Sequence, residues 1–203
     1  MIALVDYGSG NLRSVQKALL KVGADVRVIK SPAEMAGAQA VVLPGVGAFD
    51  DCVNAMQKQE LLGAIKDFIK SGRPFLGICV GYQALFDKSD EFNSCAAGLG
   101  IFPGKVVRFS SDLKIPQIGW NQLDIVLPDC PIYKGIAPGS YVYFVHSFFP
   151  KPADPSITAT ETTYGEVFAS SVWRDNVYAT QFHPEKSQAV GLQLLKNFVA
   201  LAR

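Results

Sequence analysis

The stretch PFLGICVGYQALF, residues 74–86, constrains the fold of this chain more than any other. It opens with the apolar residues of a buried strand, turns between Gly77 and Gly81, and continues with a helical pattern as far as Phe86. A strand, a sharp turn and a helix, with a reactive side chain between two glycines, is the pattern of a nucleophile elbow. The turn is strained and crowded, so small neighbours are needed. The stretch therefore predicts a turn that presents the Cys79 thiol.

The place of Cys79 at the start of a helix has chemical consequences. A helix N-terminus favours the thiolate, and the free N–H of Val80 can donate a hydrogen bond to a developing oxyanion. The alternative is a buried structural cysteine between two packing glycines, because free cysteine is usually buried. This stretch by itself favours neither interpretation.

A cysteine nucleophile needs a base, and the chain has only two histidines, His146 and His183. His183 precedes a proline and then Glu185, and the proline holds the histidine and the carboxylate in a rigid local relation. A carboxylate there can accept from one ring nitrogen while the other faces the thiol. The alternative is a histidine that caps a loop at a strand end. The presence of the elbow together with this arrangement favours a triad of Cys79, His183 and Glu185.

The order of elements indicates the fold class. In the first half, apolar runs alternate with helical spacing: strands are predicted at 2–5, 26–29, 40–43 and before Cys79, and helices at 12–22, 31–34, 49–56 and 61–69. The second half is rich in strands, predicted at 105–109, 141–149, 157–162, 167–173 and 177–182, with a closing helix at 190–201. We expect one α/β domain over residues 1–203, with a central, mostly parallel sheet flanked by helices and additional antiparallel strands in the C-terminal half.

Composition excludes several classes of function. The net charge of +1 gives no electrostatic reason for binding nucleic acid or membranes. No apolar run approaches the ~20 residues of a membrane helix. The four cysteines lack metal-ligand spacing, so no metal is expected. With no export signal recognised, we expect reduced thiols in a cytoplasmic protein. The G-x-G after the first strand is a weak dinucleotide signal, because Arg13 replaces its third glycine and Lys30 stands where an acidic residue is required.

Three motifs together resemble the class I (triad) glutamine amidotransferases: GICVGYQ around Cys79, the PGVG loop at 44–47, and HPE at 183–185. The segments DYGSGN, PGVGAF, PQIGWN, YFVHSF and HPEKS further resemble the glutaminase subunits of imidazole glycerol phosphate synthase, an enzyme of histidine biosynthesis. The chain departs from the commoner GICLGMQ at Val80 and Tyr82. The Val80 change should be mild because its backbone N–H is the donor.

The resemblance implies the class I glutamine amidotransferase fold and hydrolysis of glutamine to glutamate and ammonia through a cysteine thioester, without a cofactor. It assigns catalysis to Cys79, His183 and Glu185, and it places oxyanion donors at Val80 and at Val46 or Gly47. It implies glutamine contacts from Gly47, Gln83, Ser147 and Phe148. An ordinary helix-surface role for Gln83, and turn or strand roles for the other three, remain open.

The resemblance also implies a partner, a TIM-barrel cyclase subunit that receives the ammonia in a heterodimer. This cyclase subunit would use the ammonia to make imidazole glycerol phosphate and aminoimidazole carboxamide ribotide. Interface positions of that family match Asn11, Trp120, Tyr143 and Lys186. Trp120 could equally be a core aromatic residue, and for Lys186 alone a solvated surface charge is the better interpretation.

Other functions stay open at this point. The chain could serve another synthase, act as a stand-alone cysteine hydrolase of the same fold, or be a catalytically silent nucleotide-binding or interaction module. The resemblance, together with the glycines on both sides of Val46, also implies that the PGVG loop can rest with a carbonyl toward the site and turn an N–H there when a partner binds its ligand. The alternative is that residues 44–47 form a fixed turn and that something else, such as glutamine access, limits activity.

Overall fold

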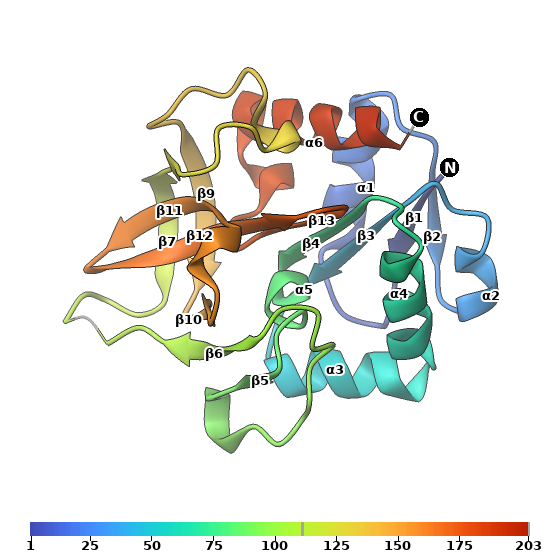
Figure 1. Cartoon of the computed structure of the whole chain (residues 1–203), viewed down its shortest axis with the longest axis horizontal. Helices are drawn as coiled ribbons and strands as arrows, with labels where there is room; N and C mark the ends of the chain where they lie inside the picture. Colours follow the sequence, from blue (N-terminus) through green and yellow to red (C-terminus); the bar gives the residue numbers. More distant parts are fainter. Residues whose placement is uncertain (111, 203) are drawn as a thin grey trace.

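The computed structural model describes residues 1–110 and 112–202, and its centre is an eight-stranded sheet (Figure 1). The strand order is β2-β1-β3-β4-β13-β12-β11-β8. The strands are β1 Ile2–Val5, β2 Val26–Ile29, β3 Ala40–Gly45, β4 Phe75–Cys79, β13 Val177–Thr180, β12 Glu166–Arg174, β11 Thr158–Tyr164 and β8 Asp124–Ile125. Pairings from β2 to β13 are parallel, and those from β13 to β8 are antiparallel. This confirms the expected fold class.

Helices cover both faces of the sheet. On one side α1 (Leu12–Lys21) packs against α6 (Gln188–Leu201), and on the other lie α3 (Phe49–Lys58) and α4 (Leu61–Lys70) (Figure 1). The short α2 (Pro32–Met35) begins at a capping box formed by Ser31 and Glu34. Each long helix buries one apolar stripe because its apolar residues recur at helical spacing. Of the described helices, none is long and apolar enough to cross a membrane.

Several expected elements end elsewhere, among them β13, which ends at Thr180, and two of these differences bear on the site. The helix after Cys79, α5, covers only Val80–Gln83 and does not reach Phe86. The reason is tertiary: the carbonyls of Ala84 and Leu85 accept hydrogen bonds from Leu99 N–H (2.8 Å) and Ile101 N–H (2.8 Å) of a returning segment. At the other position, β3 continues two residues beyond the expected end, to Gly45, where it still pairs with β4.

The expected single strand at 141–149 is two strands. β9 (Tyr141–His146) pairs with β7 (Gln117–Gln122), whereas β10 (Phe148–Pro152) pairs with β6 (Gly104–Arg108). The strand is interrupted at Ser147 because β9 and β10 belong to different sheets. β7 was not predicted from the sequence, because a glycine and an asparagine interrupt its strand-forming residues. The small β5 (Lys88–Ser89) completes the three-stranded sheet β10-β6-β5.

His146 lies inside an aromatic cluster formed by Phe109, Phe144 and Phe168. It is 6% exposed, and its Nδ1 and Nε2 lie 2.9 Å from the Phe148 carbonyl and 2.9 Å from Gln117 Oε1. Burial lowers the pKa of His146 to about 4, although the Phe148 carbonyl opposes the shift. The ring is therefore neutral at pH 7 and contributes to the core rather than to proton transfer.

We expect the free energy of unfolding to decrease as the pH is lowered from 6.5 to 4, because of His146. The unfolded ring has its ordinary pKa of 6.5 and the folded ring one of about 4. As pH falls through this window the unfolded state gains the proton first, so the free energy of unfolding falls by on the order of 3 kcal/mol. Urea unfolding at a series of pH values measures this. His146→Gln, which can keep a hydrogen bond without titrating, should show a flatter profile, and a profile parallel to the wild type would contradict the assignment.

Candidate active site

Cys79 occupies a strained position at the carboxyl end of β4. Its backbone has φ 56° and ψ −111°, a conformation that non-glycine residues rarely adopt. The turn is also crowded: a Cβ on Gly77 would lie 2.8 Å from the Gly81 carbonyl oxygen, and a Cβ on Gly81 would lie 2.0 Å from that of Leu43. Only glycine fits at these two positions, which is the reason for the G-x-C-x-G spacing. The side chain of Cys79 is free and buried.

His183 reaches the thiol because β13 runs parallel to β4, with Thr180 beside Ile78, so that both strands end at the same edge of the sheet. His183 Nδ1 lies 2.8 Å from Glu185 Oε1, and the two side chains are 3% and 1% exposed. Nε2 lies beside Cys79 and has no hydrogen-bond partner among the described residues. Burial acts to lower the pKa of His183, but Cys79 and Glu185 together raise it to about 10. The ring is therefore protonated at neutral pH.

Several contacts fix the backbone of the His-Pro-Glu turn, which forms the short helix η4 (Pro184–Lys186). His183 N–H donates to the Tyr143 carbonyl at 3.0 Å, and Ser187 Oγ donates to the His183 carbonyl at 2.7 Å. α6 packs directly on the turn: a Cβ on Gly191 would lie 1.9 Å from the Pro184 carbonyl oxygen. The orientation of the His183 ring thus depends on β9, which is distant in sequence, and on α6, which follows the turn directly.

A cavity of about 360 Å³ opens above the thiol. It collects every predicted catalytic, oxyanion and glutamine-contact residue except Glu185, which is bonded to His183 on the side of Nδ1. Its lining is Val46, Gly47, Cys79, Val80, Gln83, Glu91, Phe92, Val145, His146, Ser147, Phe148 and His183. The break between β9 and β10 is what brings Ser147 to this cavity.

Two glutamines lie near the thiol: Gln83 lines the cavity, and Gln181 lies between Gln83 and Cys79. Gln83 is 4% exposed, and its Nε2 donates to the Phe148 carbonyl at 3.0 Å and to Gln181 Oε1 at 3.2 Å. Gln181 Nε2 in turn lies 3.7 Å from Cys79 Sγ. The interpretation of Gln83 as an ordinary surface glutamine is therefore wrong. Gln181 was not predicted as a site residue, although it stands two residues before His183.

Sequence reasoning also missed Glu91 and Phe92. Glu91 lines the cavity and accepts a hydrogen bond from Phe49 N–H at 2.8 Å, and burial raises the pKa of its carboxyl, although that hydrogen bond opposes the shift. Phe92 is 83% exposed, with φ 43° and its ring 6.0 Å from that of Phe148. Both residues lie in the polar loop at 89–98. The sequence does not predict that this acidic residue and this aromatic residue reach the site, because no motif or spacing links the loop to Cys79.

The oxyanion region depends on the Gly45–Val46 peptide. Val41 N–H donates to the Pro74 carbonyl at 3.0 Å, and the parallel register continues until Gly45 lies beside Cys79. In a parallel pair, the residues that bond to the neighbouring strand alternate along the chain, so Val41, Leu43 and Gly45 all bond toward β4. The carbonyl of Gly45 is therefore directed toward β4, opposite the N–H of Val80. Because the peptide is planar and trans, Val46 N–H points away from the site. The Val46 carbonyl accepts from Ser9 Oγ at 3.1 Å.

Three of the four predicted interface residues lie together. Trp120 and Tyr143 are cross-strand partners in β7 and β9 with ring centroids 6.0 Å apart, and Lys186 Nζ lies 5.7 Å from the centroid of the Tyr143 ring. Trp120 is 45% exposed, so it is not a core residue. Lys186 contacts an aromatic face rather than only solvent. Asn11 immediately precedes α1, which packs against η4.

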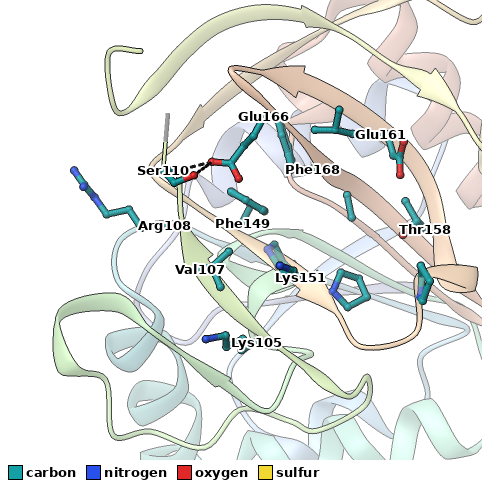
Figure 2. A pocket seen from close by; sticks show the side chains of 15 residues that line it. Lys105, Val107, Arg108, Ser110, Phe149, Lys151, Thr158, Glu161, Glu166 and Phe168 are labelled. Carbon is teal, nitrogen blue, oxygen red and sulfur yellow. Dashed lines mark hydrogen bonds between the residues drawn. The ribbon is translucent and has the colours of Figure 1, made fainter. Parts of the chain in front are cut away.

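A second cavity, of about 420 Å³, lies between β6, β10 and the β11–β12 hairpin (Figure 2). Figure 2 shows Glu166 bonded to Ser110, whose N–H donates at 2.7 Å. Lys105 is paired with Asp90 at 2.7 Å. Although this cavity is larger, it contains none of the predicted site residues, and its lining has no cysteine or histidine. Over the described part of the chain, no group of three or more His, Cys, Asp and Glu side chains could hold a metal ion.

Comparisons with known proteins agree with this geometry. Residues 3–202 match the family "Glutamine amidotransferase class-I". A protein of Syntrophotalea carbinolica named imidazole glycerol phosphate synthase subunit HisH is 53% identical, over 98% of this chain and 98% of its own length. A protein of the same name from Thermosynechococcus vestitus is 51% identical, over 100% of this chain and 97% of its own.

Solved structures show the same fold at lower identity. A glutamine amidotransferase crystal structure matches with a TM-score of 0.78 and 17% identity, covering 100% of this chain and 99% of that one. The glutaminase domain of Trypanosoma brucei CTPS matches with a TM-score of 0.73 and 15% identity, covering 99% and 92%. The chain therefore belongs to the class I glutamine amidotransferases and, within them, to the family of HisH subunits of imidazole glycerol phosphate synthase.

Proposed function

We propose that this chain hydrolyses glutamine at Cys79 and supplies the ammonia to a cyclase subunit that makes imidazole glycerol phosphate and aminoimidazole carboxamide ribotide in histidine biosynthesis. The observation that carries the proposal is that Cys79 and His183 line one cavity while Glu185 holds the far nitrogen of the His183 ring at 2.8 Å. The names of the relatives, subunits of imidazole glycerol phosphate synthase, support the pathway and the need for a partner.

In the first half of the reaction the Cys79 thiolate attacks the side-chain amide carbon of glutamine. The negative charge passes to the amide oxygen, where the Val80 N–H and one N–H of Val46 or Gly47 donate to it. The protonated His183 gives its proton to the leaving nitrogen, so that ammonia departs and a thioester remains. Glu185 holds Nδ1 and thereby keeps Nε2 directed at the reacting atoms.

In the second half, water attacks the thioester. His183, now neutral, takes a proton from the water, and the second tetrahedral intermediate collapses to glutamate and the Cys79 thiolate. The protonated ring is then restored beside the thiolate. The burial of the triad keeps bulk water from the first step.

Recognition of the glutamine backbone falls to the walls of the cavity. Gln83, Ser147, Phe148 and Gly47 present hydrogen-bonding groups of side chain and backbone there. We assign the ammonium group of glutamine to Glu91. One oxygen of its carboxylate, Oε2, accepts from Phe49 N–H, which orients the group and leaves the other oxygen for a ligand.

The partner of this proposal is a TIM-barrel cyclase, bound as a heterodimer through Asn11, Trp120, Tyr143 and Lys186. An exposed tryptophan beside a tyrosine and a lysine is the kind of cluster that forms interface hot spots. We place the complex in the cytoplasm, with the four cysteines as free thiols and residues 1–203 as one domain. Neither nucleic acid nor a membrane takes part.

Replacement of Cys79 should separate the two activities. In the complex with the cyclase, Cys79→Ser and Cys79→Ala should abolish glutamine-dependent synthesis and leave synthesis from added ammonium salts intact, because the acceptor chemistry belongs to the partner. Product formation with each nitrogen source measures this. Cys95→Ser is the control, since Cys95 is a free thiol exposed to solvent. Loss of the ammonia-dependent reaction in a folded complex would refute the proposal.

The two other triad residues should differ in their effects. His183→Ala should lower glutaminase kcat more than Glu185→Gln does, because an amide can still hold the ring whereas no other histidine replaces the base. The loss on removing an orienting carboxylate can still reach about 10⁴-fold. Steady-state kcat of each variant gives the ranking. Equal losses, or the reverse order, would count against the assigned roles.

Glu91→Gln should raise KM for glutamine and leave kcat nearly unchanged. The change removes the charge that faces the ligand ammonium and keeps the size of the side chain. A charged hydrogen bond contributes about 1.5–3 kcal/mol, so the rise in KM should be about 10- to 100-fold. Glu166→Gln is the matched control, because that carboxylate lies at the other cavity. An unchanged KM in Glu91→Gln would show that the ammonium group is bound elsewhere.

A further inference from the structure

Three buried side-chain atoms among the described residues have no hydrogen-bond partner: His183 Nε2, Glu185 Oε2 and the Tyr7 hydroxyl. The first two belong to the triad. Buried polar groups are almost always paired, so the third needs an explanation. The mechanism above does not use Tyr7, which lies in the DYGSGN segment that follows β1.

The Tyr7 hydroxyl lies against the end of β3, which carries the Gly45–Val46 peptide and is called the oxyanion strand below. It would be 2.8 Å from a Cβ on Gly45, and Tyr7 itself is only 2% exposed. Its polar neighbour is the Cys52 thiol of α3, whose sulfur is a weak acceptor and does not reach full hydrogen-bonding geometry with the hydroxyl. Burial, together with the nearby Cys52, Cys79 and Asp6, raises the pKa of the phenol. The hydroxyl is therefore protonated, and it is a hydrogen-bond donor whose one polar neighbour is a weak acceptor.

The adjacent Gly45–Val46 peptide stands in the orientation that does not serve catalysis. Its carbonyl is directed toward the Val80 N–H, and its own N–H points away from the thiol. Turning this peptide by about half a rotation aims Val46 N–H at the oxyanion. The same rotation takes the Gly45 carbonyl away from Val80, and that buried oxygen then needs a new donor.

We propose that the Tyr7 hydroxyl is this donor: it receives the Gly45 carbonyl when the peptide turns and so holds the oxyanion hole in its active form. Tyr7 is a positioning residue, since it touches neither substrate nor thiol in this role. The proposal rests on the glutaminase function proposed above. It also explains why the hydroxyl is buried at a place where the resting form offers it only the weak Cys52 thiol as a partner.

The test is Tyr7→Phe, assayed in the complex with the cyclase and the acceptor ligand of that cyclase. Glutaminase kcat under stimulation should fall by about 10- to 100-fold, because the turned carbonyl is left buried without a donor. KM for glutamine should stay within about twofold, since the glutamine contacts are unchanged. The melting temperature should not fall, because the variant removes a hydroxyl that is unpaired in the resting form.

Two further measurements separate positioning from a general structural effect. Alkylation of Cys79 by iodoacetamide is a direct displacement without an oxyanion, so its rate should be the same in Tyr7→Phe and in the wild type. The matched control is Tyr133→Phe, whose hydroxyl is also buried but donates to Ser171 Oγ at 2.7 Å. That variant should lose stability and keep kcat.

A wild-type kcat in stimulated Tyr7→Phe, or a slowed alkylation of Cys79, would overturn the assignment. Absence of glutaminase activity in the unaltered complex would instead overturn the proposed function itself. Gly45→Ala is a poor test of the same peptide, because its Cβ would lie 2.7 Å from the Gly81 nitrogen and 2.8 Å from Val80 Cβ, and the elbow would be displaced.

Discussion

The parallel pairing of β4 with β3 on one side and β13 on the other is the constraint on which the rest of the structure depends. It places Gly45 beside Cys79, and it ends β13 next to β4 so that His183 follows at the same edge. The thiol, the oxyanion strand and the base come from three separate parts of the chain. Only hydrogen bonding between neighbouring strands brings them together. A shift of register by one residue would turn each of these groups to the other face of the sheet.

The second half of the chain supports this edge. The aromatic cluster around His146 anchors β9 and β10, and the break between them carries Ser147 and Phe148 to the cavity. The Tyr143 carbonyl holds the N–H of His183, while its ring contacts Trp120 and Lys186. The same strand thus connects the backbone of the base to the cluster assigned to the partner interface. A change at that interface has a short route to the triad, through one strand and one turn.

The resting state has a consistent pattern of hydrogen bonding. The protonated His183 and the buried Glu185 form a closed pair, whereas the oxyanion strand keeps a carbonyl toward the Val80 N–H. In the proposed mechanism, the acid–base groups are therefore in place before the oxyanion donors are. An enzyme that must not release ammonia without an acceptor gains from this order, because one missing oxyanion donor lowers the rate by about 10²–10³.

Much of this protein was determined by the sequence alone. The alternation of apolar strands and helices predicted the α/β class, and local patterns predicted that Cys79, His183 and Glu185 come together, because glycine spacing and a proline act on the residues next to them. The end of α5 at Gln83, the division of β9 from β10, and the positions of Glu91, Gln181 and Tyr7 near the site were decided only by tertiary structure. Each depends on a partner distant in sequence. The 99–102 segment ends α5, and pairing with β7 and β6 divides β9 from β10. Glu91 contacts Phe49, Gln181 contacts Cys79, and Tyr7 lies against Gly45. Local propensity carries no information on such pairings, since they exist only after the chain has folded.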